Sequence, residues 1–92
     1  MDPDSVSSEI DALKKLITLS RFAMDRTVRT EEIHRQLANA KAMVSGSAGG
    51  AAADRFAAHD AALRKFLSGA TTREALGEEL ARTQDLLALG RP

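Results

Sequence analysis

SGSAGGAAADRF, residues 45–56, separates two helix-forming regions of similar length and so sets the architecture expected for the chain. Its glycines Gly46, Gly49 and Gly50 allow backbone conformations that end a helix, and the alanines after them favour a new one. A phosphate-binding loop would need a lysine followed by serine or threonine, or a preceding strand, and neither is present. We therefore predict a tight bend at residues 45–50 between two antiparallel helical arms.

The first arm covers residues 6–45 and carries two apolar stripes with helical spacing. The first stripe consists of Val6, Ile10, Leu13, Ile17, Met24 and Val28, and the second of Ile33, Leu37, Ala40 and Val44. The two stripes differ in register, and Thr30 followed by two glutamates is typical of a helix start. Asp25 and Arg29, spaced i,i+4, would instead support an unbroken helix. The arm therefore kinks or turns near residues 27–30.

The second arm covers residues 51–89 and also carries two stripes. They consist of Ala52, Phe56, His59, Leu63 and Phe66, and then of Leu76, Leu80, Thr83 and Leu87. Gly69 ends or kinks the helix between them, and the sequence from Thr71 to Glu74 matches a capping box. We predict a last helix that ends near Leu89, before Gly90.

No segment alternates between apolar and polar residues with the period of a strand, so the chain is predicted to be a single all-α domain of residues 1–92. The expected architecture is an antiparallel helical hairpin with kinked arms. An isolated pair of long helices buries one stripe on each, so pairing with a second chain would complete a four-helix bundle. The alternative is a compact monomer of four shorter helices, broken near Thr30 and Gly69.

The expected pairing face is made of apolar residues from both arms, together with one histidine. It consists of Ile10, Leu13, Ile17, Met24, Phe56, His59, Leu63 and Phe66. His59 stands on an otherwise apolar stripe, so we predict a hydrogen-bonded core histidine that sets the register of packing. The alternative is a pH-sensitive group in an interface. His34 is expected to face solvent.

The composition argues against catalytic, metal and cofactor sites. The chain has no cysteine, and its two histidines have no partner at a metal-binding spacing on one helical face. The serines cluster at the N-terminus and the central bend, where capping and turn formation explain them. We expect no enzyme activity, no cofactor and no metal ion.

Charge and hydropathy also limit the partners. Thirteen basic residues balance thirteen acidic ones, so no net field attracts nucleic acid or an anionic membrane. A DNA-binding regulator with a helix-turn-helix over residues 72–81 is a third alternative, although arginines alternate there with glutamates. No apolar run has the length of a membrane span, and MDPDSVSSEIDALKK lacks the basic start and apolar stretch of a signal peptide. We expect a cytoplasmic protein, exported only if no such leader is needed.

The central bend also resembles a known family. AGGAAADRF, residues 48–56, is similar to the turn of the WXG-type small helical-hairpin proteins of type VII (ESX) secretion. In this resemblance Gly50 is the motif glycine and Phe56 the aromatic residue six positions later, while Ala48 replaces the motif tryptophan. The chain also has no tyrosine for the family's C-terminal export signal. The resemblance implies a hairpin that pairs with a second hairpin and is exported without a leader.

The expected function is therefore a non-enzymatic helical interaction module, with type VII secretion as its suggested setting. It would bind a protein partner, as a homo- or hetero-oligomer, through helix packing. The alternative is a small helical regulator or chaperone-like adaptor subunit, either homodimeric or monomeric.

Overall fold

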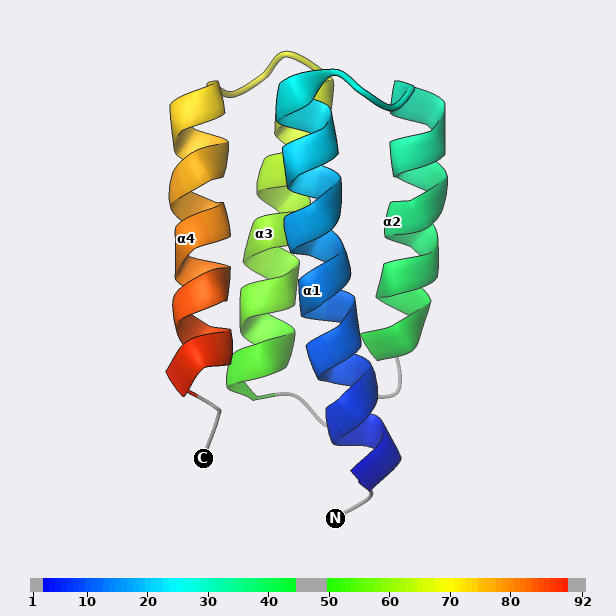
Figure 1. Cartoon of the computed structure of the whole chain (residues 1–92), viewed down its shortest axis with the longest axis vertical. Coiled ribbons are helices and arrows are strands. Elements are labelled where there is room, and N and C mark those ends of the chain that lie inside the picture. The colour runs from blue at the N-terminus through cyan, green and yellow to red at the C-terminus, as the bar shows by residue number, and fades with distance from the viewer. Residues whose placement is uncertain (1–2, 45–49, 90–92) are drawn as a thin grey trace.

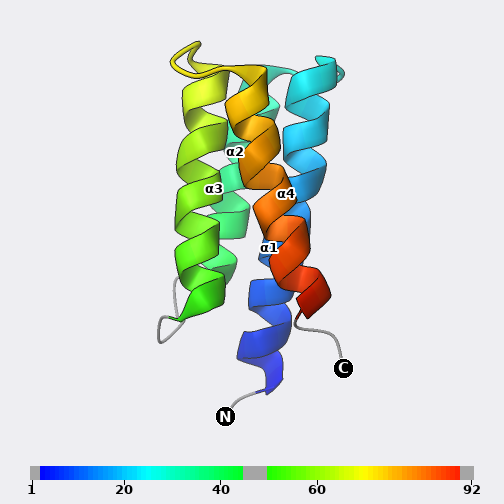
Figure 2. The ribbon, with the colours of Figure 1, turned by 90° about the vertical axis from the view of Figure 1, so that its left-hand side faces the viewer.

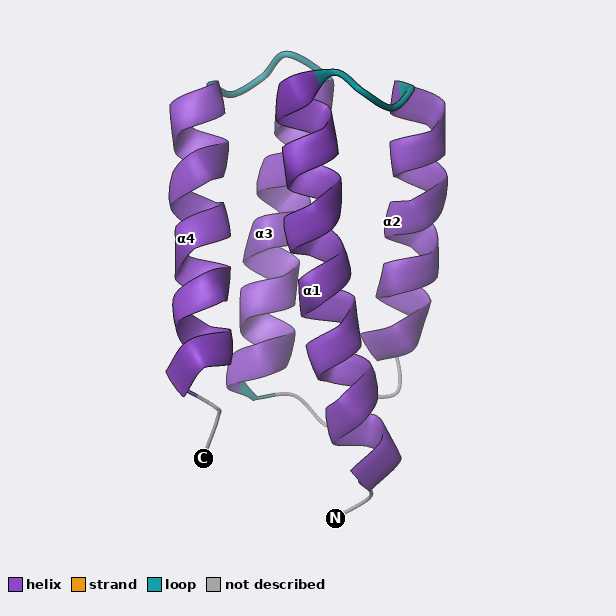
Figure 3. Cartoon of the chain, in the orientation of Figure 1, coloured by secondary structure: helices purple, strands orange, loops and turns teal. Residues whose placement is uncertain are grey.

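Four helices form where the apolar stripes run. A computed structural model describes the backbone of residues 3–44 and 50–89, and the side chains of residues 9–44 and 50–89. The helices are α1 (Pro3–Asp25), α2 (Thr30–Val44), α3 (Ala51–Leu67) and α4 (Arg73–Leu89), and they run alternately up and down (Figure 1). The described residues contain no strand (Figure 3). The prediction of an all-α fold is confirmed.

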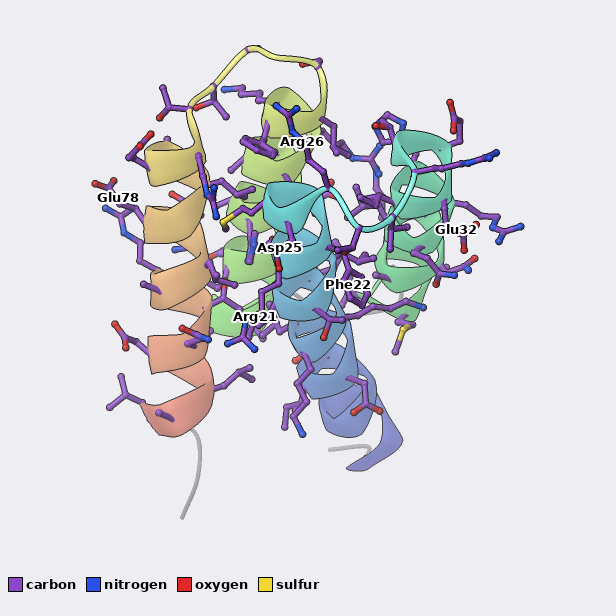
Figure 4. The ribbon with its side chains drawn as sticks, turned by 45° about the horizontal axis from the view of Figure 1, so that its top comes forward. Arg21, Phe22, Asp25, Arg26, Glu32 and Glu78 are labelled. Carbon is purple, nitrogen blue, oxygen red and sulfur yellow. The ribbon has the colours of Figure 1, made fainter. Side chains whose placement is uncertain are left out.

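The chain reverses direction between α1 and α2. Arg26 adopts a left-handed conformation with φ 56°. Its N–H donates to the carbonyl of Ala23 at 3.4 Å, and the N–H of Thr27 donates to the carbonyl of Phe22 at 3.2 Å. These two bonds form a Schellman motif, which ends α1. Figure 4 shows Arg26 at this end of α1, where the chain leaves toward α2.

A second Schellman motif ends α3. Gly69 has φ 80°, its N–H donates to the carbonyl of Phe66 at 3.1 Å, and the N–H of Ala70 donates to the carbonyl of Lys65 at 2.7 Å. The N-cap of α4 is one residue later than predicted. Thr72, not Thr71, accepts a hydrogen bond from the backbone N–H three residues on, that of Ala75 at 3.1 Å, because α4 begins at Arg73.

The two turns change the architecture expected for the arms. Each predicted arm is folded into two antiparallel helices that pack against each other, which corresponds to the alternative of four shorter helices. The longest dimension of the molecule is 39 Å, whereas a straight helical arm would reach roughly 60 Å. The Schellman motifs turn the chain fully back, so one chain supplies all four helices. Pairing with a second chain stays a prediction.

The core lies between all four helices, and α1 contributes most to it. Helix α1 packs against the other three, whereas α2 and α4 stand on opposite sides of α1 and α3 (Figures 1 and 2). The buried apolar side chains are Ala12, Leu13, Leu16, Leu19, Ala23, Ile33, Leu37, Ala40, Phe56, Leu63 and Leu76. Only one of these belongs to α4, so this helix has the smallest apolar share in the core.

Candidate functional site

Three polar side chains meet inside this core. Ser20 comes from α1, His59 from α3 and Thr83 from α4, and all three are 0% exposed. Each occupies a core-facing position of an amphipathic helix, so packing the apolar stripes together also brings these groups together. We call them the polar cluster.

Hydrogen bonds satisfy every member of the polar cluster. His59 Nε2 lies 2.7 Å from Ser20 Oγ, and His59 Nδ1 lies 2.7 Å from Thr83 Oγ1. The hydroxyl of Thr83 also donates to the carbonyl oxygen of Glu79 at 3.1 Å. Because this donation uses the hydroxyl hydrogen of Thr83, we assign the proton of the neutral imidazole to Nδ1, which donates to Thr83. Nε2 then accepts a hydrogen bond from the hydroxyl of Ser20.

The environment keeps this imidazole neutral at physiological pH. Burial, and secondarily the positive charge of Arg55, lower the pKa of His59 from 6.5 to about 4. The cluster contains hydroxyl groups and no carboxylate, so it offers an imidazolium no opposite charge.

A partly buried ion pair lies beside the cluster. Arg55 of α3 pairs with Glu79 of α4, and Glu79 also pairs with the more exposed Arg82. Burial lowers the pKa of Arg55, with a smaller contribution from the charge of Arg82. The Nε atom of Arg55 is buried and makes no hydrogen bond. This ion pair and the polar cluster both join α3 to α4.

The cluster has the order of groups of a nucleophilic triad, with a serine hydroxyl, a histidine and a further polar group behind the histidine. However, no reacting group can reach side chains that are 0% exposed. The surface grooves between α3 and α4 and between α1 and α4 are lined by other residues. The arrangement instead selects one register of packing, because any other register would bury hydroxyl and imidazole groups without partners.

The predicted pairing face is divided by the structure. Four of its members, Leu13, Phe56, His59 and Leu63, are buried among the chain's own helices. Ile17, Met24 and Phe66 are partly buried, whereas Ile10 is 37% exposed. The prediction of a hydrogen-bonded core histidine at position 59 is confirmed, and His34 is exposed as expected.

The bend is described only in part. Gly50 immediately precedes α3 with φ 115°, a conformation that side-chain-bearing residues rarely adopt. Gly46 and Gly49, and the motif position Ala48, lie outside the described residues.

Sequence reasoning missed the polar cluster, although a signal was present. Ser20 interrupts the first apolar stripe and Thr83 stands within the last one, as His59 does in the third. A polar residue in an apolar stripe needs a buried partner. Three such residues on three helices could have been matched to one another.

The described residues hold neither a metal site nor a membrane span. They contain no group of three or more histidine or acidic side chains placed to hold a metal ion. None of their helices combines the length and apolar character needed to cross a membrane.

Among known proteins, no family model, no curated protein and no solved structure matches this chain.

Proposed function

We propose that this chain is a non-enzymatic helical interaction module that binds a protein partner through α1. The observation that supports it is that part of the predicted pairing face stays accessible. Ile10 is 37% exposed, and one heptad further along α1 the half-buried Ile17 lines a groove with Leu87 of α4. The first turns of α1 also extend beyond the lower ends of the other helices (Figure 2). A partner helix packed along Ile10 and Ile17 would bury apolar surface that is exposed in the single chain.

Matched substitutions on α1 test this proposal. Ile10→Glu places a negative charge on the proposed docking strip of Ile10 and Ile17. Phe22→Glu places the same charge at a position of nearly equal exposure, 38%. We expect Ile10→Glu to weaken association at least tenfold and Phe22→Glu to change it little. Sedimentation of the purified chain over a concentration series measures self-association, and titration with a small helical protein encoded beside it measures hetero-association. A chain that stays monomeric and binds no such protein would rule the proposal out.

The type VII setting is a narrower form of this proposal. It is supported by Gly50, whose left-handed backbone comes directly before the alanines that start α3, and by the buried Phe56 that follows. A stable 1:1 complex with a neighbouring hairpin protein, and co-export of the two chains, is the expected result. If the chain binds a partner but neither protein leaves the cell with a functioning type VII apparatus, the interaction module stands without this setting.

A self-contained adaptor or regulator subunit is the second candidate. It is supported by the burial of Leu13, Leu37, Leu63 and Leu76 within one chain. A melting temperature independent of protein concentration is expected for a monomer, since a dissociating oligomer melts at higher temperature when it is more concentrated.

A further inference from the structure

We propose that the polar cluster is an acid-sensitive latch, which holds α4 against α1 and α3 near neutral pH and releases α4 when His59 is protonated. The proposal concerns a conformational change of the chain itself and does not depend on any partner.

The latch lies on α4, the helix that buries the fewest side chains. This helix packs against α1 and α3, and its backbone does not come close to that of α2. Only two of its side chains, Leu76 and Thr83, are fully buried, and His59 binds one of them. The turn between α3 and α4 lies near Leu76, so Thr83 holds the part of α4 that is distant from this turn.

Among the described residues, the charged groups around His59 leave no unpaired carboxylate for an imidazolium. On α3, the cationic Arg55 is one turn earlier, and the neighbouring Asp60 binds Arg64. On α4, the nearby carboxylate of Glu79 is bound by Arg55 and Arg82. On α1, the partner is the uncharged hydroxyl of Ser20, and the buried side chains of α2 are all apolar. A proton on His59 therefore adds a positive charge near Arg55, on a ring that is 0% exposed.

Protonation also changes the hydrogen bonding of the latch. The neutral ring accepts from Ser20 through Nε2 and donates to Thr83 through Nδ1. An imidazolium donates through both nitrogens, so the hydroxyl of Ser20 must turn its hydrogen away from the ring. Opening α4 removes both penalties, because water then solvates the charged ring.

The expected rise in the opening equilibrium constant of α4 at low pH follows from the linkage between protonation and opening. In the closed bundle the pKa of His59 is lowered to about 4, while an exposed ring keeps the ordinary value of 6.5. Between these values the open form binds more protons than the closed form, so acid favours opening. The opening equilibrium constant should rise about 20-fold from pH 7 to pH 5.

Hydrogen exchange of the full chain tests the latch, with rates corrected for the intrinsic effect of pH. We expect amides in the second half of α4 to lose protection about 20-fold between pH 7 and pH 5. At both pH values these amides should be less protected than the best-protected amides of α1 and α2, which exchange only on global unfolding. Equal protection in all four helices at pH 5 would overturn the proposal, because α4 would then open only together with the whole bundle.

Two histidine variants complete the test. His59→Gln should abolish the pH dependence in α4, and His34→Gln, at the exposed histidine, should leave it unchanged. An NMR titration of the unaltered chain keeps the proposal testable if His59→Gln does not fold. In the closed bundle burial lowers the pKa of His59 to about 4. A His59 resonance that titrated near the ordinary value of 6.5 would overturn the latch.

Discussion

The two halves of this bundle are held together by different interactions. The α1–α2 half packs aliphatic side chains only, with Leu16 and Leu37 at 0% exposure, apart from the single hydroxyl of Ser20. The α3–α4 half places His59 and Thr83 in the core beside an ion pair between the two helices. The hydrophobic contribution tolerates changes of pH, whereas buried polar contacts depend on protonation and on exact geometry. We therefore expect the aliphatic contacts of α1 and α2 to stabilise the bundle at any pH, and the polar contacts of α3 and α4 to make its packing specific and sensitive to pH.

The largest effect is expected from a cavity in the aliphatic half. Leu16→Ala removes a fully buried side chain of α1 and should lower the free energy of unfolding by about 3 kcal/mol. Equilibrium urea unfolding at pH 7 measures it. Leu89→Ala is the control, because Leu89 is 83% exposed and its loss should cost little. Equal effects from both variants would contradict the assigned core.

A broken hydrogen bond in the α3–α4 half should lower the free energy of unfolding by less than this cavity does. Thr83→Val keeps the shape of the side chain but leaves the Nδ1–H of His59 without an acceptor. We expect a loss of about 1 to 3 kcal/mol in the free energy of unfolding, from the desolvation of an unpaired group. Thr83→Ser retains the hydroxyl and should recover most of this loss. No recovery with serine would mean that the packed methyl group, and not the hydrogen bond, matters here.

The change of the free energy of unfolding with pH should come from the α3–α4 half and not from the α1–α2 half. Because the pKa of His59 is lowered from 6.5 to about 4 on folding, the unfolded chain takes up the proton first as pH falls. Stability is therefore complete above pH 6.5, declines from there toward pH 4, and should be lower at pH 5 than at pH 7 by about 2 kcal/mol. Urea unfolding at the two pH values measures this difference. His59→Gln should remove it, while Leu16→Ala should lower stability equally at both.

The smallest effects concern the two turns, which share one motif but use different residues. Arg26 has φ 56° and Gly69 has φ 80°, and left-handed backbone is disfavoured for residues with a Cβ atom. Arg26→Gly should raise the free energy of unfolding by up to about 1 kcal/mol, and Gly69→Ala should lower it by about the same amount. A Cβ at position 69 would meet no atom within 4 Å, so the cost there is one of backbone conformation. Calorimetry that showed the same sign for both variants would contradict this account.

Much of the fold could be predicted from local patterns. The stripes around Leu13, Leu37, Leu63 and Leu76 lie on helices, and Gly69 ends one of them, because helix periodicity and capping depend on residues a few positions apart. The register of α1 was less predictable. The structure buries Leu16 and leaves Ile10 exposed, because the buried face depends on where the neighbouring helices stand.

The candidate site was predictable only at its centre. An imidazole on an apolar stripe needs partners, so the sequence predicts a hydrogen-bonded core histidine at position 59, as the structure has it. Its partners are 39 and 24 residues away along the chain, at Ser20 and Thr83, and no local spacing connects them.

The helical character of this chain and the apolar stripes that must be covered can be read from local patterns, because these properties follow from interactions within one or two turns. The packing of the whole chain decided that each arm folds back on itself, so that the stripes cover one another within a single chain. It also decided that three isolated polar residues become one buried cluster. The physical reason is that burial and hydrogen bonding between distant segments depend on the packing of the whole bundle, and packing is not a local property.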